Sequence, residues 1–162
     1  MFSLIEAKKT EAPRSDSLKS GLERKSRPKE MVIKNFSTKT PTLDYFLSEN
    51  KKHVLLCINP IGLDHDLYVS HLEKDGTYTE PKSLGSVLNT KGIELGAFLA
   101  SDNVTLYFSS DGHGGYGSSD IFMTKRLDET WENWSTPVNL GETVNSKRYE
   151  SDFSISAKGD YA

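Results

Sequence analysis

The chain has 162 residues, with 20 Lys and Arg against 23 Asp and Glu, which gives a net charge of −3. This balance argues against a general nucleic-acid-binding protein, since such proteins usually present a basic face. No apolar run approaches the roughly 18 residues that a membrane-spanning helix needs, so we expect no membrane span. The single cysteine, Cys57, excludes an intrachain disulfide and leaves the redox compartment open.

Residues 1–30 differ in composition from the rest of the chain. They hold eight Lys or Arg, five Asp or Glu and few large apolar residues. Such a segment offers little apolar surface to bury, so we expect a mobile tail or linker. Its first residues lack a basic region followed by an apolar stretch, which argues against a signal peptide there.

From Met31 onward the pattern is that of β-structure. Short runs rich in Val, Ile, Leu, Phe and Tyr alternate with turn clusters of Gly, Asp, Asn and Pro, and no segment has the apolar stripe of a long helix. The sequence therefore predicts an all-β fold. The clearest expected strands are 53–58, 66–72, 104–110 and 120–127.

This β-rich part contains an internal repeat. Segments 43–50 and 95–102 match at a spacing of 52 residues, and 80–94 aligns with 136–150. Each period holds about four short strands, which is typical of a β-propeller blade. We therefore expect an incomplete β-propeller over residues 31–162, with two to two and a half four-stranded antiparallel blades whose copies begin near 43, 95 and 151.

Stacked blades would bury the apolar residues of the second copy and of the start of the third between sheets. The residues that we expect to be buried there are Phe98, Leu106, Phe108, Ile121, Met123, Leu140, Phe153 and Ile155.

One stretch, Gly112 to Gly117, spells G-x-G-x-x-G. In a dinucleotide-binding fold these glycines follow a strand and open a helix. Here the residues after Gly117 have the pattern of another strand, so a hairpin loop is the better interpretation. Asp66 and Asp120 stand just before the third strand of each copy, where a short carboxylate can accept backbone N–H bonds and close the turn.

Residues 100–156 resemble the WD-like Pro-Asp β-propeller repeat of TolB-type proteins, especially the version in OmpA-family envelope proteins of Bacteroidetes-type bacteria. Two departures stand out: the Pro of the Pro-Asp pair is missing, and Asn103 replaces a glycine. The matching positions are Ser101, Asp102, Leu106 to Phe108, Ser110, Gly114 to Gly117, Asp120, Ile121, Trp134, Pro137, Asn139 to Gly141, Asn145 and Glu150.

This resemblance implies a non-catalytic scaffold or protein-binding segment, with a protein or a cell-wall component as partner. It implies a location in the periplasm or outer membrane, and it implies that a longer parent chain supplies the missing blades. The alternative is a fragment of a propeller enzyme, either glycoside-acting or the gating propeller of a peptidase.

The sequence offers few candidates for chemistry. The four histidines lack zinc-site spacing and there is no G-x-S-x-G motif, so we expect no catalytic residue, no metal and no cofactor. An alternative remains in which Asp111, His113 and Asp120 line a cation site. With Tyr116 and Trp131 added, the candidate residues for ligand binding are Asp111, His113, Tyr116, Asp120 and Trp131.

Overall fold

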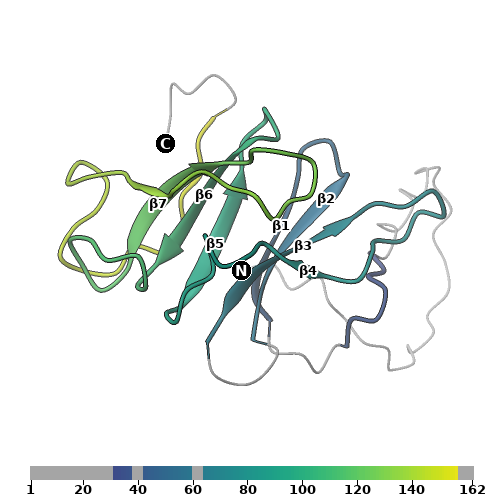
Figure 1. Ribbon diagram of the computed structural model, residues 1–162, viewed down its shortest axis with the longest axis horizontal. Coiled ribbons are helices and arrows are strands. Elements are labelled where there is room, and N and C mark those ends of the chain that lie inside the picture. The colour runs from purple at the N-terminus through teal and green to yellow at the C-terminus, as the bar shows by residue number, and fades with distance from the viewer. Residues whose placement is uncertain (1–30, 38–41, 60–63, 157–162) are drawn as a thin grey trace, which may run out of the picture. The chain divides into compact units, whose positions relative to one another are not determined.

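The computed structural model describes residues 31–37, 42–59 and 64–156, and the predicted tail over 1–30 lies outside these residues (Figure 1). The described residues contain strands and turns but no helix, which confirms the all-β prediction. They therefore also contain no helix with the length and apolar character needed to cross a bilayer.

Eight strands form two four-stranded antiparallel sheets, each in sequential order, β1-β2-β3-β4 and β5-β6-β7-β8. The expected strands are confirmed, except that the fourth strand of each sheet is only two residues long. The first sheet contains β1 (Thr42–Leu47), β2 (His53–Ile58), β3 (Asp66–His71) and β4 (Lys82–Ser83). The second contains β5 (Glu94–Leu99), β6 (Thr105–Ser110), β7 (Asp120–Lys125) and β8 (Val138–Asn139).

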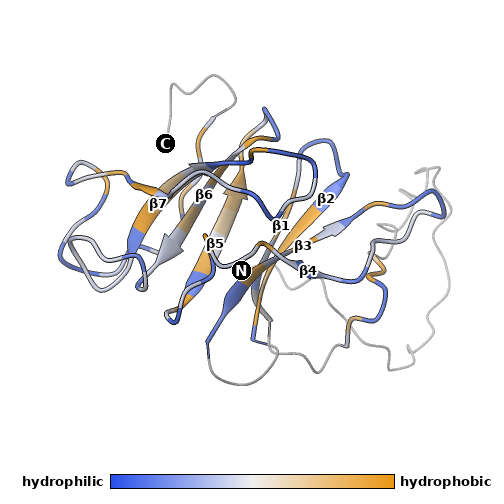
Figure 2. Ribbon diagram, in the orientation of Figure 1, coloured by the Kyte–Doolittle hydropathy of each residue, from blue (hydrophilic) through white to orange (hydrophobic). Residues whose placement is uncertain are grey.

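The main apolar core lies between one face of each sheet, and Figure 2 shows the apolar residues concentrated in the strands. Because side chains alternate along a strand, every second residue of β2, β3, β5 and β6 points into this layer. The first sheet contributes Leu55, Cys57, Leu67, Val69, Leu84 and Leu88, and the second contributes Ala97, Leu99, Leu106, Phe108 and Phe122, with Trp131 and Trp134 from the loop after β7.

The two sheets correspond position by position. Leu84 of the first sheet is fully buried against the second, whereas the corresponding Leu140 is half-buried. Leu140 lies on the far face of the second sheet, which we call the outer face. No other sheet of the described residues covers it. Its residues Tyr107, Ser109, Ile121, Met123, Leu140 and Val144 correspond to Leu55, Cys57, Leu67, Val69, Leu84 and Leu88.

This difference corrects part of the burial prediction. Leu106, Phe108 and Ile121 are buried as expected. The other five, Phe98, Met123, Leu140, Phe153 and Ile155, are only half-buried. The ring of Phe153 lies 4.9 Å from that of Tyr107 on the outer face, so the segment 151–156 covers this face only in part.

Candidate functional site

The glycine-rich stretch forms the loop between β6 and β7, which pair as neighbouring antiparallel strands. Gly114 and Gly115 have φ of 73° and 148°, in the region that favours glycine. No helix begins at Gly117, and β7 begins three residues later at Asp120. The prediction of a hairpin loop is therefore confirmed, and the helix N-terminus that a dinucleotide phosphate needs is missing from this loop.

Asp120 closes this loop from inside. Its side chain is 1% exposed, and its carboxylate accepts hydrogen bonds from the backbone N–H of Tyr116 at 2.5 Å and of Gly117 at 3.1 Å. The side-chain amide of Asn139 donates a third bond at 2.8 Å. By accepting from these three donors, Asp120 holds the turn, as its position just before the third strand of the sheet predicts.

The other loop candidates have separate partners. Asp111 Oδ1 accepts a hydrogen bond from the backbone N–H of Ile93 at 2.7 Å, and His113 Nε2 donates to the carbonyl oxygen of Leu88 at 2.8 Å. Tyr116 is 48% exposed, and Asp111 is exposed as well. Within the described residues, no three His, Cys, Asp or Glu side chains are grouped so as to hold a metal ion.

Trp131, the fifth candidate, lies at the opposite end of the sheets, in the loop after β7. Its side chain is only 2% exposed and its indole packs between the two sheets. The structure therefore does not bring Trp131 together with the glycine loop. It brings Trp131 to two histidines of the first sheet instead.

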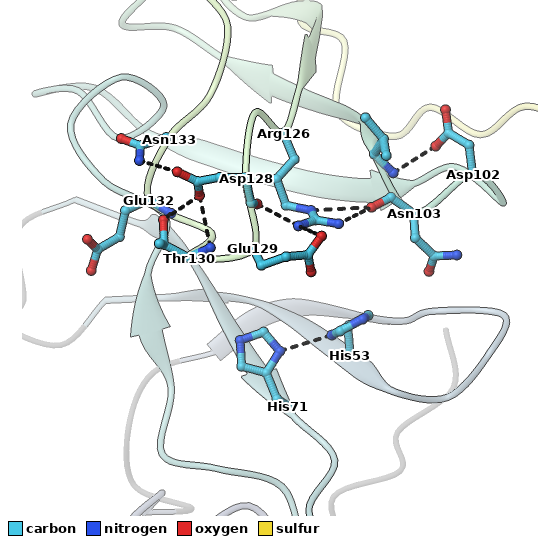
Figure 3. Close-up of polar contacts among 11 residues, drawn as sticks. His53, His71, Asp102, Asn103, Arg126, Asp128, Glu129, Thr130, Glu132 and Asn133 are labelled. Atoms are coloured by element: carbon cyan, nitrogen blue, oxygen red, sulfur yellow. Dashed lines mark hydrogen bonds and ion pairs between the residues drawn. The ribbon is translucent and has the colours of Figure 1, made fainter.

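His53 begins β2 and His71 ends β3, and the two residues face each other in the register of these strands. Their Nδ1 atoms are 2.9 Å apart (Figure 3). A pocket of about 510 Å³ opens beside them. We call it the histidine pocket. It is lined by Lys52, His53, His71, Leu72, Glu73, Lys74, Glu129 and Trp131.

Arg126 holds the loop after β7 above this pocket (Figure 3). Its guanidinium donates to the carbonyl oxygens of Asn103 at 3.2 Å and Asp128 at 2.5 Å, and forms an ion pair with Glu129 at 3.0 Å. The same group lies 4.7 Å from the centre of the Trp131 ring, in the position of a cation–π contact.

The surroundings of both histidines favour the neutral imidazole. Burial, with smaller contributions from His71, Arg126 and Lys52, lowers the pKa of His53 to about 4. Burial also lowers the pKa of His71, and the nearby cations Lys82 and Arg126 act in the same direction. A neutral imidazole pair can share one N–H···N hydrogen bond, which a doubly protonated pair cannot form.

A second, smaller pocket of about 210 Å³ lies beside the first strands of the two sheets. Burial, and more weakly the charge of Asp152, raises the pKa of Asp44 at its edge. Aromatic rings form much of its wall: Phe46 and Phe98 meet edge to face, with centroids 5.0 Å apart. Gly96 and Phe153 also line it.

Sequence reasoning missed the pairing of His53 with His71, since the two are 18 residues apart and match no metal-binding motif. Aligning the ends of the expected strands 53–58 and 66–72 as a hairpin would have placed the two histidines opposite each other. Searches of protein-family models, curated proteins and solved structures return no match to this chain.

Proposed function

We propose that this chain is part of a WD-like β-propeller that serves as a non-catalytic scaffold for protein binding in a bacterial envelope. The supporting observation is the correspondence between the two sheets. The face of the first sheet that the second sheet covers has the same positions as the outer face of the second. A repeat architecture buries its faces by stacking one unit on the next, so this correspondence favours a further sheet on the outer face.

The segment that follows the second sheet, residues 150–153, contacts the outer face of that sheet. Ser109 Oγ lies within hydrogen-bond distance of the carbonyl oxygen of Glu150, and Phe153 packs on Tyr107. Phe153 corresponds to Ala97, which faces the first sheet across the core. Residues 150–153 therefore contact the second sheet as 94–97 contact the first, which favours a third unit beginning there.

The non-catalytic part of the proposal is supported by the roles of the loop acids. Asp120, Asp111 and Asp102 each accept backbone N–H bonds that fix turns. Carboxylates that accept backbone N–H bonds to hold turns are poor candidates for a catalytic acid–base pair, because both groups of such a pair must be free to exchange protons with a substrate. The envelope location and the protein partner rest on the sequence resemblance.

The test is an activity panel of chromogenic glycosides and fluorogenic peptides, run with the wild-type chain and with Asp111→Asn. We expect no turnover above buffer. Turnover that is lost in Asp111→Asn would establish the alternative, a fragment of a propeller enzyme. The coding sequence around this chain gives an independent check, because a peptidoglycan-binding domain downstream supports the scaffold and a hydrolase domain contradicts it.

A further inference from the structure

His53, His71 and Trp131 form one contact between the two sheets, which we call the histidine contact. The two imidazole rings meet edge to face, with centroids 5.1 Å apart and planes at 87°. The indole of Trp131 lies against both, 4.6 Å from His53 and 5.4 Å from His71. The loop after β7 is thus seated on the first sheet through two titratable rings.

This seat holds the loop in a strained conformation. Trp131 has φ of 65°, a left-handed value that is strained for a residue with a side chain. The seat that offsets this strain includes the burial of the indole against the histidines and the bond from Trp134 Nε1 to the Trp131 carbonyl oxygen at 2.9 Å. If these contacts weaken, release of the loop would relieve the backbone strain at Trp131.

The charges around the contact do not favour protonated histidines. Arg126 lies over the same indole and is paired with Glu129, whose charge raises the pKa of His53 by less than burial, His71, Arg126 and Lys52 lower it. Glu73, the other acid of the pocket, is paired with Lys34. The charged groups around the two histidines are Lys52 beside β2, Glu73 and Lys74 after β3, Lys82 on β4, and Arg126 and Glu129 in the loop after β7.

We propose that the histidine contact is a pH-sensitive device, which seats the 126–134 loop on the first sheet at neutral pH and releases Trp131 when His53 and His71 are protonated. Two imidazolium rings with facing nitrogens 2.9 Å apart repel each other and lose their shared hydrogen bond. Release of Trp131 opens the histidine pocket to solvent and relaxes the backbone at this residue.

The lowered pKa values fix the direction of the change. A histidine whose folded pKa lies below its unfolded value of 6.5 stabilises the closed form fully above that value. The stabilisation is lost as the pH falls toward the folded pKa, which is about 4 for His53. The release is therefore expected between about pH 6.5 and 4.

The experiment follows the fluorescence of Trp131 from pH 7.5 to 4. A Trp134→Phe background leaves Trp131 as the only tryptophan, and far-UV circular dichroism monitors the sheets in the same samples. We expect a red shift of Trp131 emission in this range while the β-sheet signal is retained. The shift should be absent in the His53→Gln/His71→Gln double variant and unchanged in His65→Gln, a histidine outside the contact. Amide exchange of residues 127–134 in the otherwise wild-type chain checks that Trp134→Phe does not cause the effect.

A variant with a positive charge at position 71 at neutral pH gives a second test of the proposal. His71→Lys should show the red-shifted emission already at pH 7.5, with the sheet signal intact. The proposal is overturned by a transition that persists in the double variant, by constant Trp131 emission down to pH 4, or by loss of emission and sheet signal together at one midpoint.

Discussion

The side-chain amide of Asn145 binds both backbone groups of Ile121: its Oδ1 accepts from the Ile121 N–H at 2.8 Å, and its Nδ2 donates to the Ile121 carbonyl at 3.0 Å. Asn89 makes the same two bonds with Leu67, at 2.9 and 3.0 Å. Each asparagine supplies the acceptor for a third-strand N–H that the two-residue fourth strand leaves unpaired, and adds a second donor to a carbonyl oxygen that already accepts from the backbone N–H of Leu84 or Leu140. A long fourth strand is therefore unnecessary in either sheet.

Replacing Asn145 with Ala should leave the buried N–H of Ile121 without this acceptor, while the carbonyl keeps its bond from Leu140 N. An orphaned buried donor costs about 1–3 kcal/mol, so the free energy of unfolding should fall by that amount. Urea denaturation at neutral pH measures it. The exposed Asn133→Ala serves as control and should change stability by less than about 0.5 kcal/mol. Equal values for the two variants would contradict this role.

Leu84 and Leu140 form a matched pair, since they occupy the same position in the two sheets and differ in burial. Leu84→Ala should cost about 2–5 kcal/mol, as for a leucine in a packed core. Leu140→Ala should cost clearly less, because the outer face is only partly covered. Thermal and urea unfolding of both variants give the comparison. A larger loss for Leu140→Ala would mean that the outer face is better packed than the structure shows.

Gly96 and Gly114 both have positive φ, 61° and 73°, but only Gly96 is crowded. A Cβ at Gly96 would overlap the carbonyl oxygen of Ser151, whereas open space surrounds Gly114. Both Ala variants carry the backbone strain, and Gly96→Ala should cost an additional 1–3 kcal/mol or so from overpacking. The difference in unfolding free energy isolates the contact between β5 and the segment 151–156. No difference between the variants would show that this segment does not lie against β5.

Cys57 is buried, and its thiol lies 3.0 Å from the carbonyl oxygen of Glu94, to which it donates. Burial, with smaller contributions from nearby carboxylates, raises the pKa of Cys57 to about 12. Because the thiolate is the reactive form, we expect the folded protein to react very slowly with a thiol reagent at pH 8. In urea the same thiol should react at the rate of a free cysteine. Rapid labelling of the folded protein would contradict the burial of Cys57.

The local parts of the fold could be predicted from the sequence. The runs 53–58 and 120–127 show their strand character through apolar and β-branched residues. Asp120 could be assigned to a turn because its two backbone partners are within four residues. Both features depend on short-range geometry. The shortness of the fourth strand could not be predicted, because the side chain of Asn145, several residues beyond it, takes the place of part of the ladder by bonding the backbone of Ile121.

The remaining parts depend on contacts between distant residues. Burial of Met123 and Leu140 was expected because the apolar pattern marks a face, but a pattern does not show whether another layer covers that face. The histidine contact likewise depends on residues that are distant in the sequence. It needs the register of β2 with β3 and the position of the loop that begins at Arg126, and neither is encoded near His53.

The two-residue length of β4 and β8 also bears on how the molecule associates. A sheet edge recruits a foreign strand through a row of unpaired N–H and C=O groups, and such recruitment leads to aggregation. Lys82–Ser83 and Val138–Asn139 offer only a very short row of this kind. Edge-to-edge pairing is therefore disfavoured at β4 and β8, so a foreign strand would have to pair with the opposite edges of the two sheets, β1 and β5, which are six residues long.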